Sequence, residues 1–289
     1  MKNQEIREFL SSRRAKLTPA EAGLPLYGSK RRVAGLRREE VALLADISVE
    51  YYTRLERGEA SGVSNDVLDA VSRALRLDEA EHQHLLDLVR HADGDRRVRR
   101  SSRSPQVRPS IRRLVDGLTA MPAIVSNARH DVLYANRLGE ALFLEVFSDP
   151  VRPPNTSRYI FLDPRAATFY TDWEAVAHDV VAALRGEAGR NPHDRALSDL
   201  VGLLSTRSQE FRTLWAGHDV LFHRTGVKRF HHPLVGDLAL TWDALPLPAD
   251  PGLALATYSA DPGSPSDEAL HELARWTEAR QALKPSVSR

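Results

Sequence analysis

A stretch that cannot contribute to a hydrophobic core divides this chain into two parts. Residues 94–110, GDRRVRRSSRSPQVRPS, consist largely of arginine, serine and proline, with almost no apolar side chain. Such a segment cannot bury enough apolar surface to offset the entropy of ordering, so we expect a linker over residues 93–110. Two separate domains must then form, from residues 1–92 and 111–276, followed by a tail over residues 277–289.

Charge is distributed unevenly among these parts, although the formal net charge of the chain is only +1. Residues 1–92 are neutral, residues 93–113 carry +6 and residues 114–289 carry −5. Such asymmetry indicates that part of the chain meets a polyanion while the rest has another role. The linker arginines, Arg96 to Arg108, are candidate phosphate contacts; alternatively, they only keep the domains apart.

The composition excludes several classes of protein. The chain has no cysteine, which excludes a disulfide framework, thiolate catalysis and Cys-ligated zinc. It has no apolar run of about 18 residues, as a membrane span needs. The N-terminal sequence MKNQEIREFLSSRRAK is too polar for a signal peptide. We therefore expect a cytoplasmic protein that makes no membrane contact.

The N-terminal part has the apolar spacing of short helices. Leu68, Val71 and Leu75 recur at i, i+3 and i+7, and Ser64 precedes them as a helix cap. Asp78 can likewise cap the helix EAEHQHLLDLVR. Five short helices within about 90 residues predict an all-α domain.

The C-terminal part has mixed helix and strand patterns. Residues 124–127 and 132–135 flank a polar turn and predict a hairpin. The segments DLALTWDAL and LALATYS alternate apolar and polar residues, as half-buried strands do. Residues 176–184 and 197–204 have helical spacing. A few antiparallel strands with helices on one side predict an α+β domain.

The segment LRREEVALLADISVEYYTRLERGE, residues 36–59, has the spacing of a helix-turn-helix. We expect a first helix over residues 38–45, a tight turn, and a second helix that Ser48 caps and Gly58 ends. Major-groove readers place outward residues of the N-terminal half of such a second helix against base edges.

The second helix supplies the candidate base-reading residues. Tyr52 and Leu55 should face the bundle together with Val41 and Leu44. The candidate base-reading residues are Ser48, Val49, Glu50, Tyr51 and Arg54. The candidate phosphate contacts, which would add affinity without sequence information, are Arg31, Arg32, Arg37, Arg38 and Arg57.

Side-chain chemistry supports this assignment. Arg54 can bind O6 and N7 of guanine, Glu50 can accept from the amino group of cytosine, and Val49 can contact a thymine methyl. The alternative is a helical protein-interaction module, without specific DNA recognition, whose arginines are only solvated. The segment LRLDEAEHQHLLDLVR could pack against its own copy, which is compatible with either reading.

Two sets of motifs resemble known families. Residues 36–90, with GLRREEVALLADISVEYYTRLERG and VLDAVSRALRLDEAEHQHL, resemble the XRE-type helix-turn-helix. Residues 111–276 resemble the MmyB-like ligand-binding domain through FLDPRA, DWEAVAHDVVAALR, LWAGHDV, KRFHHPLVGDLALTWDAL and YSADPGSPSDEALHELARW. The resemblance implies a multidomain transcriptional regulator: an all-α helix-turn-helix domain that binds a double-stranded DNA operator, usually as a homodimer, and an α+β PAS-like sensor. It also implies a small amphiphilic ligand, fatty-acyl or lipid-like.

The chain departs from phage-type relatives at the reading helix. Those relatives have Gln, which anchors a phosphate, at the position of Arg38, and a Gln pair where Val49 and Glu50 stand here. An arginine keeps a hydrogen-bond donor but makes the contact more dependent on salt. No operator sequence can therefore be transferred to this chain.

The sensor half contains polar residues that could anchor an amphiphile in a mostly apolar pocket. The candidate polar anchors are Trp215, His218, Arg229, His231 and Tyr258, and the candidate walls are Val125, Leu133, Leu240 and Trp242. An ordinary core would contain the same aliphatic residues.

The sensor half also contains residues that could form a metal site or a catalytic site. The cluster His218, Asp219, His223, His231 and His232 could bind a metal, but it lacks the HExxH motif and known zinc spacings. We therefore expect neither metal nor cofactor.

No phosphate-binding, dinucleotide-binding or GxSxG motif is present either. Ser264 and Ser266 are best explained as helix-cap residues, and Asp172 and Glu174 as charges at a helix start. We expect no enzymatic activity.

Overall fold

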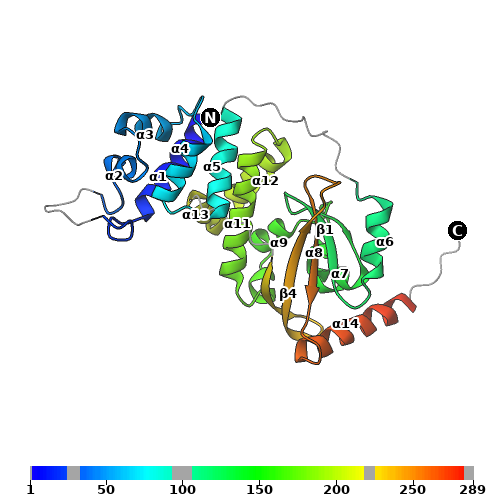
Figure 1. Cartoon of the computed structure of the whole chain (residues 1–289). Coiled ribbons are helices and arrows are strands. Elements are labelled where there is room, and N and C mark those ends of the chain that lie inside the picture. The colour runs from blue at the N-terminus through cyan, green and yellow to red at the C-terminus, as the bar shows by residue number, and fades with distance from the viewer. Residues whose placement is uncertain (1, 25–32, 93–105, 218–224, 283–289) are drawn as a thin grey trace. The chain divides into compact units, whose positions relative to one another are not determined.

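The computed structural model describes residues 2–24, 33–92, 106–217 and 225–282 (Figure 1). Contacts divide the chain into two compact units. Unit 1 comprises the described residues within Met1–Arg100, Val181–Arg195 and Thr213–Phe222, and the other described residues form unit 2. No helix among the described residues has the length and apolar character needed to span a bilayer.

Unit 1 contains the five N-terminal helices that the apolar spacing predicts. They are α1 (Lys2–Lys16), α2 (Arg38–Leu44), α3 (Val49–Glu56), α4 (Asn65–Ala74) and α5 (Glu79–Ala92). Their common core includes Phe9 of α1, Val41 of α2, Tyr52 of α3, Val71 of α4 and Leu85 of α5, all at most 1% exposed. The predicted all-α domain is therefore confirmed.

Unit 2 is built on one five-stranded antiparallel sheet in the order β2-β1-β5-β4-β3. Its strands are β1 (Ala123–Asn127), β2 (Val132–Ala135), β3 (Thr225–His232), β4 (Gly236–Pro246) and β5 (Leu253–Ser259). The β1–β2 hairpin and strands β4 and β5 were predicted. Strand β3 was not predicted as a strand.

Helices join the strands and continue the chain beyond them. They are α6 (Pro109–Gly117), α7 (Arg137–Leu142), α8 (Leu144–Ser148), α9 (Thr156–Leu162), α10 (Ala166–Phe169), α11 (Trp173–Arg190), α12 (Arg195–Arg207), α13 (Gln209–Ala216) and α14 (Pro265–Ala282).

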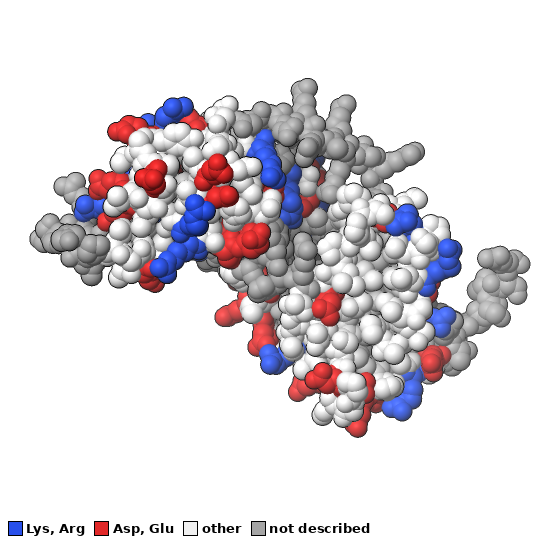
Figure 2. Space-filling model, in the orientation of Figure 1, with Lys and Arg blue, Asp and Glu red and all other residues white. Residues whose placement is uncertain are grey.

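The sheet is covered on both faces. On one face, Val115 of α6 is buried in a cluster with Val125 and Leu255. On the other face, Phe143, between α7 and α8, packs against Phe230 and Tyr258. The α+β class is confirmed, whereas the expectation of helices on one side only was wrong. The region of unit 2 around β4 carries few charged side chains in the view of Figure 2.

The sensor part begins before residue 111. Val107 is 5% exposed, and α6 begins at Pro109 with the proline ring in its first turn. Arg108 is paired with Asp250, with Nη2 and Oδ2 2.8 Å apart, so its guanidinium has a structural partner. The linker arginines of residues 96–103 lie outside the described residues. At the other end, α14 continues through Ala282, so the expected tail begins inside a helix.

Helix α11 belongs to both units. Its residues up to Val180 lie in unit 2, and from Val181 onward they lie in unit 1. Figure 1 shows it as one continuous helix.

Candidate functional site

Helices α2 and α3 form the helix-turn-helix, and its local geometry follows from a few residues. Asp46 in the turn has a φ of 53°, a left-handed conformation that aspartate tolerates. The Ser48 Oγ accepts a hydrogen bond from the Tyr51 N–H at 3.1 Å and so caps α3. Gly58 follows the helix with a φ of 87°. The predicted helix bounds, cap and stop are all confirmed.

The packing of α3 leaves one face open. Tyr52 and Leu55 are at most 1% exposed and lie in the unit 1 core, which holds the helix in place. Ser48, Val49, Glu50 and Arg54 are exposed, and Tyr51 is half-buried. The Arg54 guanidinium lies 3.4 Å from the Glu59 carboxylate, and both side chains are more than half exposed. A fixed helix thus presents these side chains at its surface, as major-groove recognition requires.

A buried carboxylate connects three helices beneath this face. Glu56 of α3 is 1% exposed and accepts from Nε of Arg14 in α1 at 2.7 Å. It also accepts from Nε of Arg38 in α2. Arg14 donates further to the Leu36 carbonyl at 2.8 Å. Two guanidinium groups balance the carboxylate, as a buried charge requires.

Sequence reasoning missed the role of Glu56. It lies four residues after Tyr52 and one after Leu55, so helical spacing places it on their buried side. That spacing was the available signal. Arg38 was predicted as a phosphate contact, but its ion pair with Glu56 gives it a structural role, and 47% of its side chain remains exposed.

The other candidate phosphate contacts differ in how far they can be described. Arg37 is exposed, 3.5 Å from Glu39, and its backbone N–H donates to the Glu40 carboxylate at 2.6 Å, which closes the first turn of α2. Arg57 is the exposed C-cap of α3. Arg31 and Arg32 lie outside the described residues. Acidic and basic side chains intermingle over unit 1 on the face that Figure 2 shows.

An aromatic cluster lies on the face of the unit 2 sheet opposite α6. Phe143 lies 5.2 Å from Tyr258, and Phe169 lies 5.2 Å from Phe230, measured between ring centroids. The ring of Tyr170 contacts that of Phe169 edge-on and that of Phe230 at a tilt. All five side chains are at most 4% exposed. The interior of the sensor is therefore apolar and aromatic.

The candidate pocket walls lie on two faces of the sheet. Val125 and Leu133 belong to the cluster under α6. Leu240 and Tyr258 are buried on the face opposite α6. Trp242 pairs directly with Tyr258 in the β4–β5 register and so lies on that face too. Side chains alternate between faces along a strand, so these residues cannot line one cavity. The prediction of a single pocket needs this correction.

The polar anchors predicted in β3 point away from that face. Arg229 is exposed and pairs with Asp172, with Nη1 3.2 Å from Oδ2. His231 is exposed, with its Nδ1 2.6 Å from Oδ1 of Asp237. Their neighbour His232 is buried, with its Nε2 3.0 Å from the Ala141 carbonyl. Successive residues of a strand face opposite sides of the sheet, so each predicted anchor lies one residue away from an inward-facing position.

The remaining predicted anchors also fall elsewhere. His218 lies outside the described residues, as do Asp219 and His223. Trp215 lies in unit 1, where the Arg185 guanidinium stacks over its ring at 4.2 Å and donates to its carbonyl. The eight candidate pocket residues that the structure describes are therefore not brought together.

The inward positions of β3 include a lysine that sequence reasoning passed over. Lys228 lies two residues from Phe230, on the same face, with its Nζ 4.2 Å from the centre of the Trp242 ring. Burial lowers its pKa to about 8, against an opposing effect of the Asp179 carboxylate. Its one-residue offset from Arg229 places the two side chains on opposite faces of the strand.

A partly buried histidine lies within the electrostatic range of Lys228. His130, in the β1–β2 turn with a φ of 63°, has its Nδ1 2.8 Å from the Ser157 Oγ. Burial and, to a smaller extent, the positive charge of Lys228 lower its pKa to about 4. His130 is therefore neutral at physiological pH.

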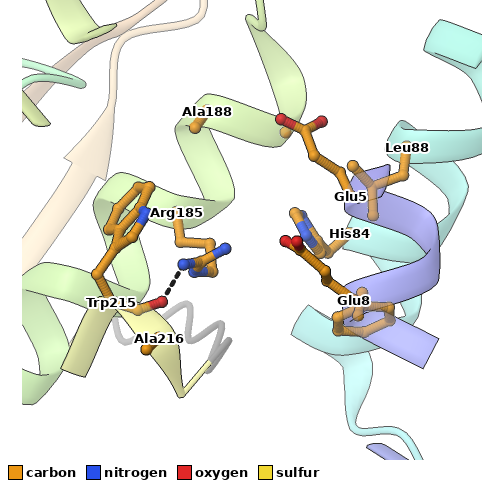
Figure 3. A pocket seen from close by; sticks show the side chains of 10 residues that line it. Glu5, Glu8, His84, Leu88, Arg185, Ala188, Trp215 and Ala216 are labelled. Carbon is orange, nitrogen blue, oxygen red and sulfur yellow. Dashed lines mark hydrogen bonds between the residues drawn. The ribbon is translucent and has the colours of Figure 1, made fainter. Parts of the chain in front are cut away.

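Unit 1 contains a small pocket (Figure 3). Arg185 of α11 and Trp215 of α13 lie on one side, and Glu5, Glu8 and His84 of α1 and α5 on the other. Its volume is about 200 Å³, below the roughly 300–1,000 Å³ of most small-molecule sites. Charged groups on both sides make it a poor host for a lipid-like molecule.

The described residues suggest neither a metal centre nor a catalytic serine. Among them, no three His, Asp or Glu side chains are close enough to share an ion. The Ser264 Oγ accepts from the Asp267 N–H at 3.2 Å and caps α14, as predicted. Ser266 was also predicted as a cap, but its Oγ accepts from the Ala239 N–H of β4 at 2.9 Å. That contact joins α14 to the sheet.

Comparison with known families agrees with this architecture. A model of the MmyB-like transcription regulator ligand binding domain matches residues 107–273, which is more than half of the chain. A model of a helix-turn-helix domain matches residues 12–85. No curated protein matches the chain. The two domains in this order are those of a ligand-responsive transcription regulator. The chain therefore belongs to the MmyB-like transcription regulators, with an N-terminal helix-turn-helix followed by the family's ligand-binding domain.

Proposed function

We propose that this protein recognises a specific operator as a homodimer, and that a small amphiphilic ligand of its sensor domain changes its affinity for that operator. The observation that carries the first part is the exposed face of α3. Val49, Glu50 and Arg54 are exposed there on a helix that buried Tyr52 and Leu55 hold in place. Two copies related by a two-fold axis would meet half-sites about one helical turn apart.

The test is selection from random DNA duplexes at two salt concentrations, followed by sequencing. Enrichment of a two-fold symmetric site that persists at the higher salt would support specific dimeric recognition, because phosphate contacts alone weaken steeply with salt. Binding that enriches no sequence and disappears with salt would contradict it. Sedimentation with and without the selected duplex would show whether two chains bind.

A matched pair of variants sharpens this test. Arg54→Ala removes an exposed arginine from the last turn of α3, and Arg73→Ala removes an exposed arginine from the last turn of α4. Loss of sequence preference in the first variant alone would assign recognition to α3. Equal effects of both would favour a general electrostatic contribution of unit 1.

The ligand belongs to the same proposal. The aromatic interior between the sheet and helices α7–α10 suits an apolar chain, and the family resemblance favours a fatty-acyl or similar lipid-like molecule. We infer a regulatory role without catalysis, in the cytoplasm where operator DNA lies. A ligand alters DNA binding only if it binds the two DNA-binding states with different affinity.

A further inference from the structure

The second half of α11 contacts the N-terminal helices at a glycine. Gly189, near the end of α11, lies against His84 of α5, and both residues belong to unit 1. A Cβ at Gly189 would stand 2.4 Å from Cε1 and 2.7 Å from Nδ1 of the imidazole. Side-chain carbons do not approach other atoms so closely. A larger residue at this position would therefore have to displace either the imidazole or the helix.

The imidazole is also held on its other side. The His84 side chain is 5% exposed, and its ring lies edge-on to that of Phe9 in α1, with centroids 5.1 Å apart. Phe9 in turn lies 5.3 Å from the Arg13 guanidinium, which pairs with Glu81 of α5 at 2.7 Å. His84 is thus enclosed by α1 and α11, so it cannot easily turn away from Gly189. The position of α11 is fixed against two helices of the bundle.

The surroundings of this contact are open and charged. A pocket of about 200 Å³ beside His84 separates Arg185 and Trp215 from Glu5 and Glu8 (Figure 3). Among the described residues, the apolar core of the five N-terminal helices includes no side chain of α11 or α13. Contacts between parts of a chain that are polar and lack a shared apolar core resemble transient interfaces, and they allow relative motion. The contact between Gly189 and His84 can therefore open without disrupting the core of the bundle.

We propose that the contact between Gly189 and His84 is a reversible clasp, through which the sensor half controls the helix-turn-helix. The recognition face of α3 remains exposed while the clasp is closed, so the closed form is able to bind DNA. Opening the clasp gives the helix-turn-helix more freedom, which operator binding must then remove at a cost in affinity. The inference rests on the proposed ligand-responsive function and names the contact that transmits the response.

The first test uses the full-length protein, whose lack of cysteine makes introduced thiols unambiguous. Gly189→Cys is combined with His84→Cys, which also removes the imidazole and leaves room for two sulfur atoms. Oxidation should link the two residues within one chain. A short bismaleimide, used in parallel because disulfide geometry is demanding, should do the same, and mass spectrometry of the intact chain and of its peptides detects either link.

The matched control pair combines Gly202→Cys of α12 with the same His84→Cys. Gly202 is exposed, and a Cβ there would meet no atom within 4 Å, so this pair should stay unlinked. No link at position 189 with either reagent, or equal linking in the control pair, would overturn the inference, because the clasp would then not form in solution.

Operator binding tests what the clasp does. Gly189→Leu should keep it open and weaken operator affinity at least about threefold, since binding must then restrict a more mobile domain. Gly202→Leu, which also replaces a glycine of a helix, should bind like the wild type, and circular dichroism verifies that both variants keep their helices. The linked protein should retain wild-type affinity. Weaker binding by the linked protein, or unchanged binding by Gly189→Leu, would contradict the clasp.

A fatty-acyl probe separates this inference from the proposed function. Where decanoate changes the operator affinity of the wild type, it should change that of the linked protein less, and an equal change in both would overturn the inference. A wild type that selects no operator, or that does not respond to decanoate, would count against the proposed function. The cross-linking still tests the clasp in that case, because it needs neither DNA nor a ligand.

Discussion

Two arginines of the helix-turn-helix carry the same charge in different surroundings. Arg54 is 66% exposed and has a loose ion pair with exposed Glu59. Arg38 is paired with Glu56, which is 1% exposed. Surface ion pairs contribute little to stability, whereas a buried carboxylate that loses a partner is strongly destabilising. Replacement by alanine should therefore affect base discrimination at Arg54 and the free energy of unfolding at Arg38.

Arg54→Ala should relax recognition without destabilising the protein. Loss of a contact to one guanine would reduce discrimination at one base pair by about 1 to 3 kcal/mol. Affinity for random DNA should change little more than in Arg73→Ala. Competition binding with single-base variants of the selected site measures this. Equal losses on operator and random DNA would show that Arg54 contacts only phosphate.

Arg38→Ala should lower the free energy of unfolding. Glu56 would keep Arg14 but lose its second partner, at a cost of about 1 to 3 kcal/mol. Arg37→Ala, next to it, removes an exposed side chain and should change stability by less than about 0.5 kcal/mol. Urea unfolding of both variants makes the comparison. A stable Arg38→Ala that binds all DNA more weakly would restore the simple phosphate role.

His130 should make the protein less stable in acid. Its folded pKa of about 4 lies below the ordinary value of 6.5, so between these values the unfolded chain binds the proton and the folded chain does not. Stability is therefore lost as pH falls from 6.5 to 4, by about 3 kcal/mol. His130→Asn tolerates the positive φ and does not titrate in this range.

Comparison of His130→Asn with the wild type isolates the contribution of His130 to the loss of stability in acid. Chemical unfolding at pH 7 and pH 4.5 should show a smaller loss in His130→Asn than in the wild type. His232, whose pKa burial also lowers, contributes equally to both proteins. Parallel pH profiles would mean that His130 is accessible to water.

At the scale of elements, α3 depends on its cap. Ser48 was predicted to take part in base reading, and the structure shows its Oγ holding the Tyr51 N–H. Ser48→Ala should lower the free energy of unfolding by about 1 kcal/mol, and Ser48→Asn should restore most of it. Thermal unfolding tests the cap, and operator binding of Ser48→Asn tests base reading. Full stability in Ser48→Ala would refute the capping role.

The elements that could be predicted from sequence share one property. Helices α2 and α3 and strands β4 and β5 have several apolar residues at one period, bounded by Ser48 and Gly58 or by turn residues. Helices α8 and α10 have only five and four residues, too few to show a period. Their positions depend on tertiary packing.

Strand β3 and the sensor interior could not be predicted for a related reason. The segment TGVKRFHH carries cations on both faces, so it lacks apolar alternation. Without the strand register, nothing distinguishes Lys228 from Arg229 as the inward residue. Glu56 was missed because a charged side chain in a buried position depends on arginines from two other helices. Such contacts are set by tertiary structure.

At the scale of the whole molecule, α11 is the helix whose residues are divided between the two units. Asp179 interacts electrostatically with Lys228, and the helix passes into unit 1 two residues later. We propose that a ligand of the sensor acts on DNA binding through this helix.

Because binding free energies are linked, the coupling between ligand binding and operator binding can be measured through the affinity for either one. If decanoate changes operator affinity by some factor, operator DNA must change decanoate affinity by the same factor. Titrations of each ligand with and without the other should give equal factors, and a duplex of scrambled sequence should give none. Asp179→Asn removes a charge of α11 two residues before the helix enters unit 1, and it should show a smaller coupling factor. An unchanged factor in this variant would mean that the ligand acts on DNA binding through another element than α11.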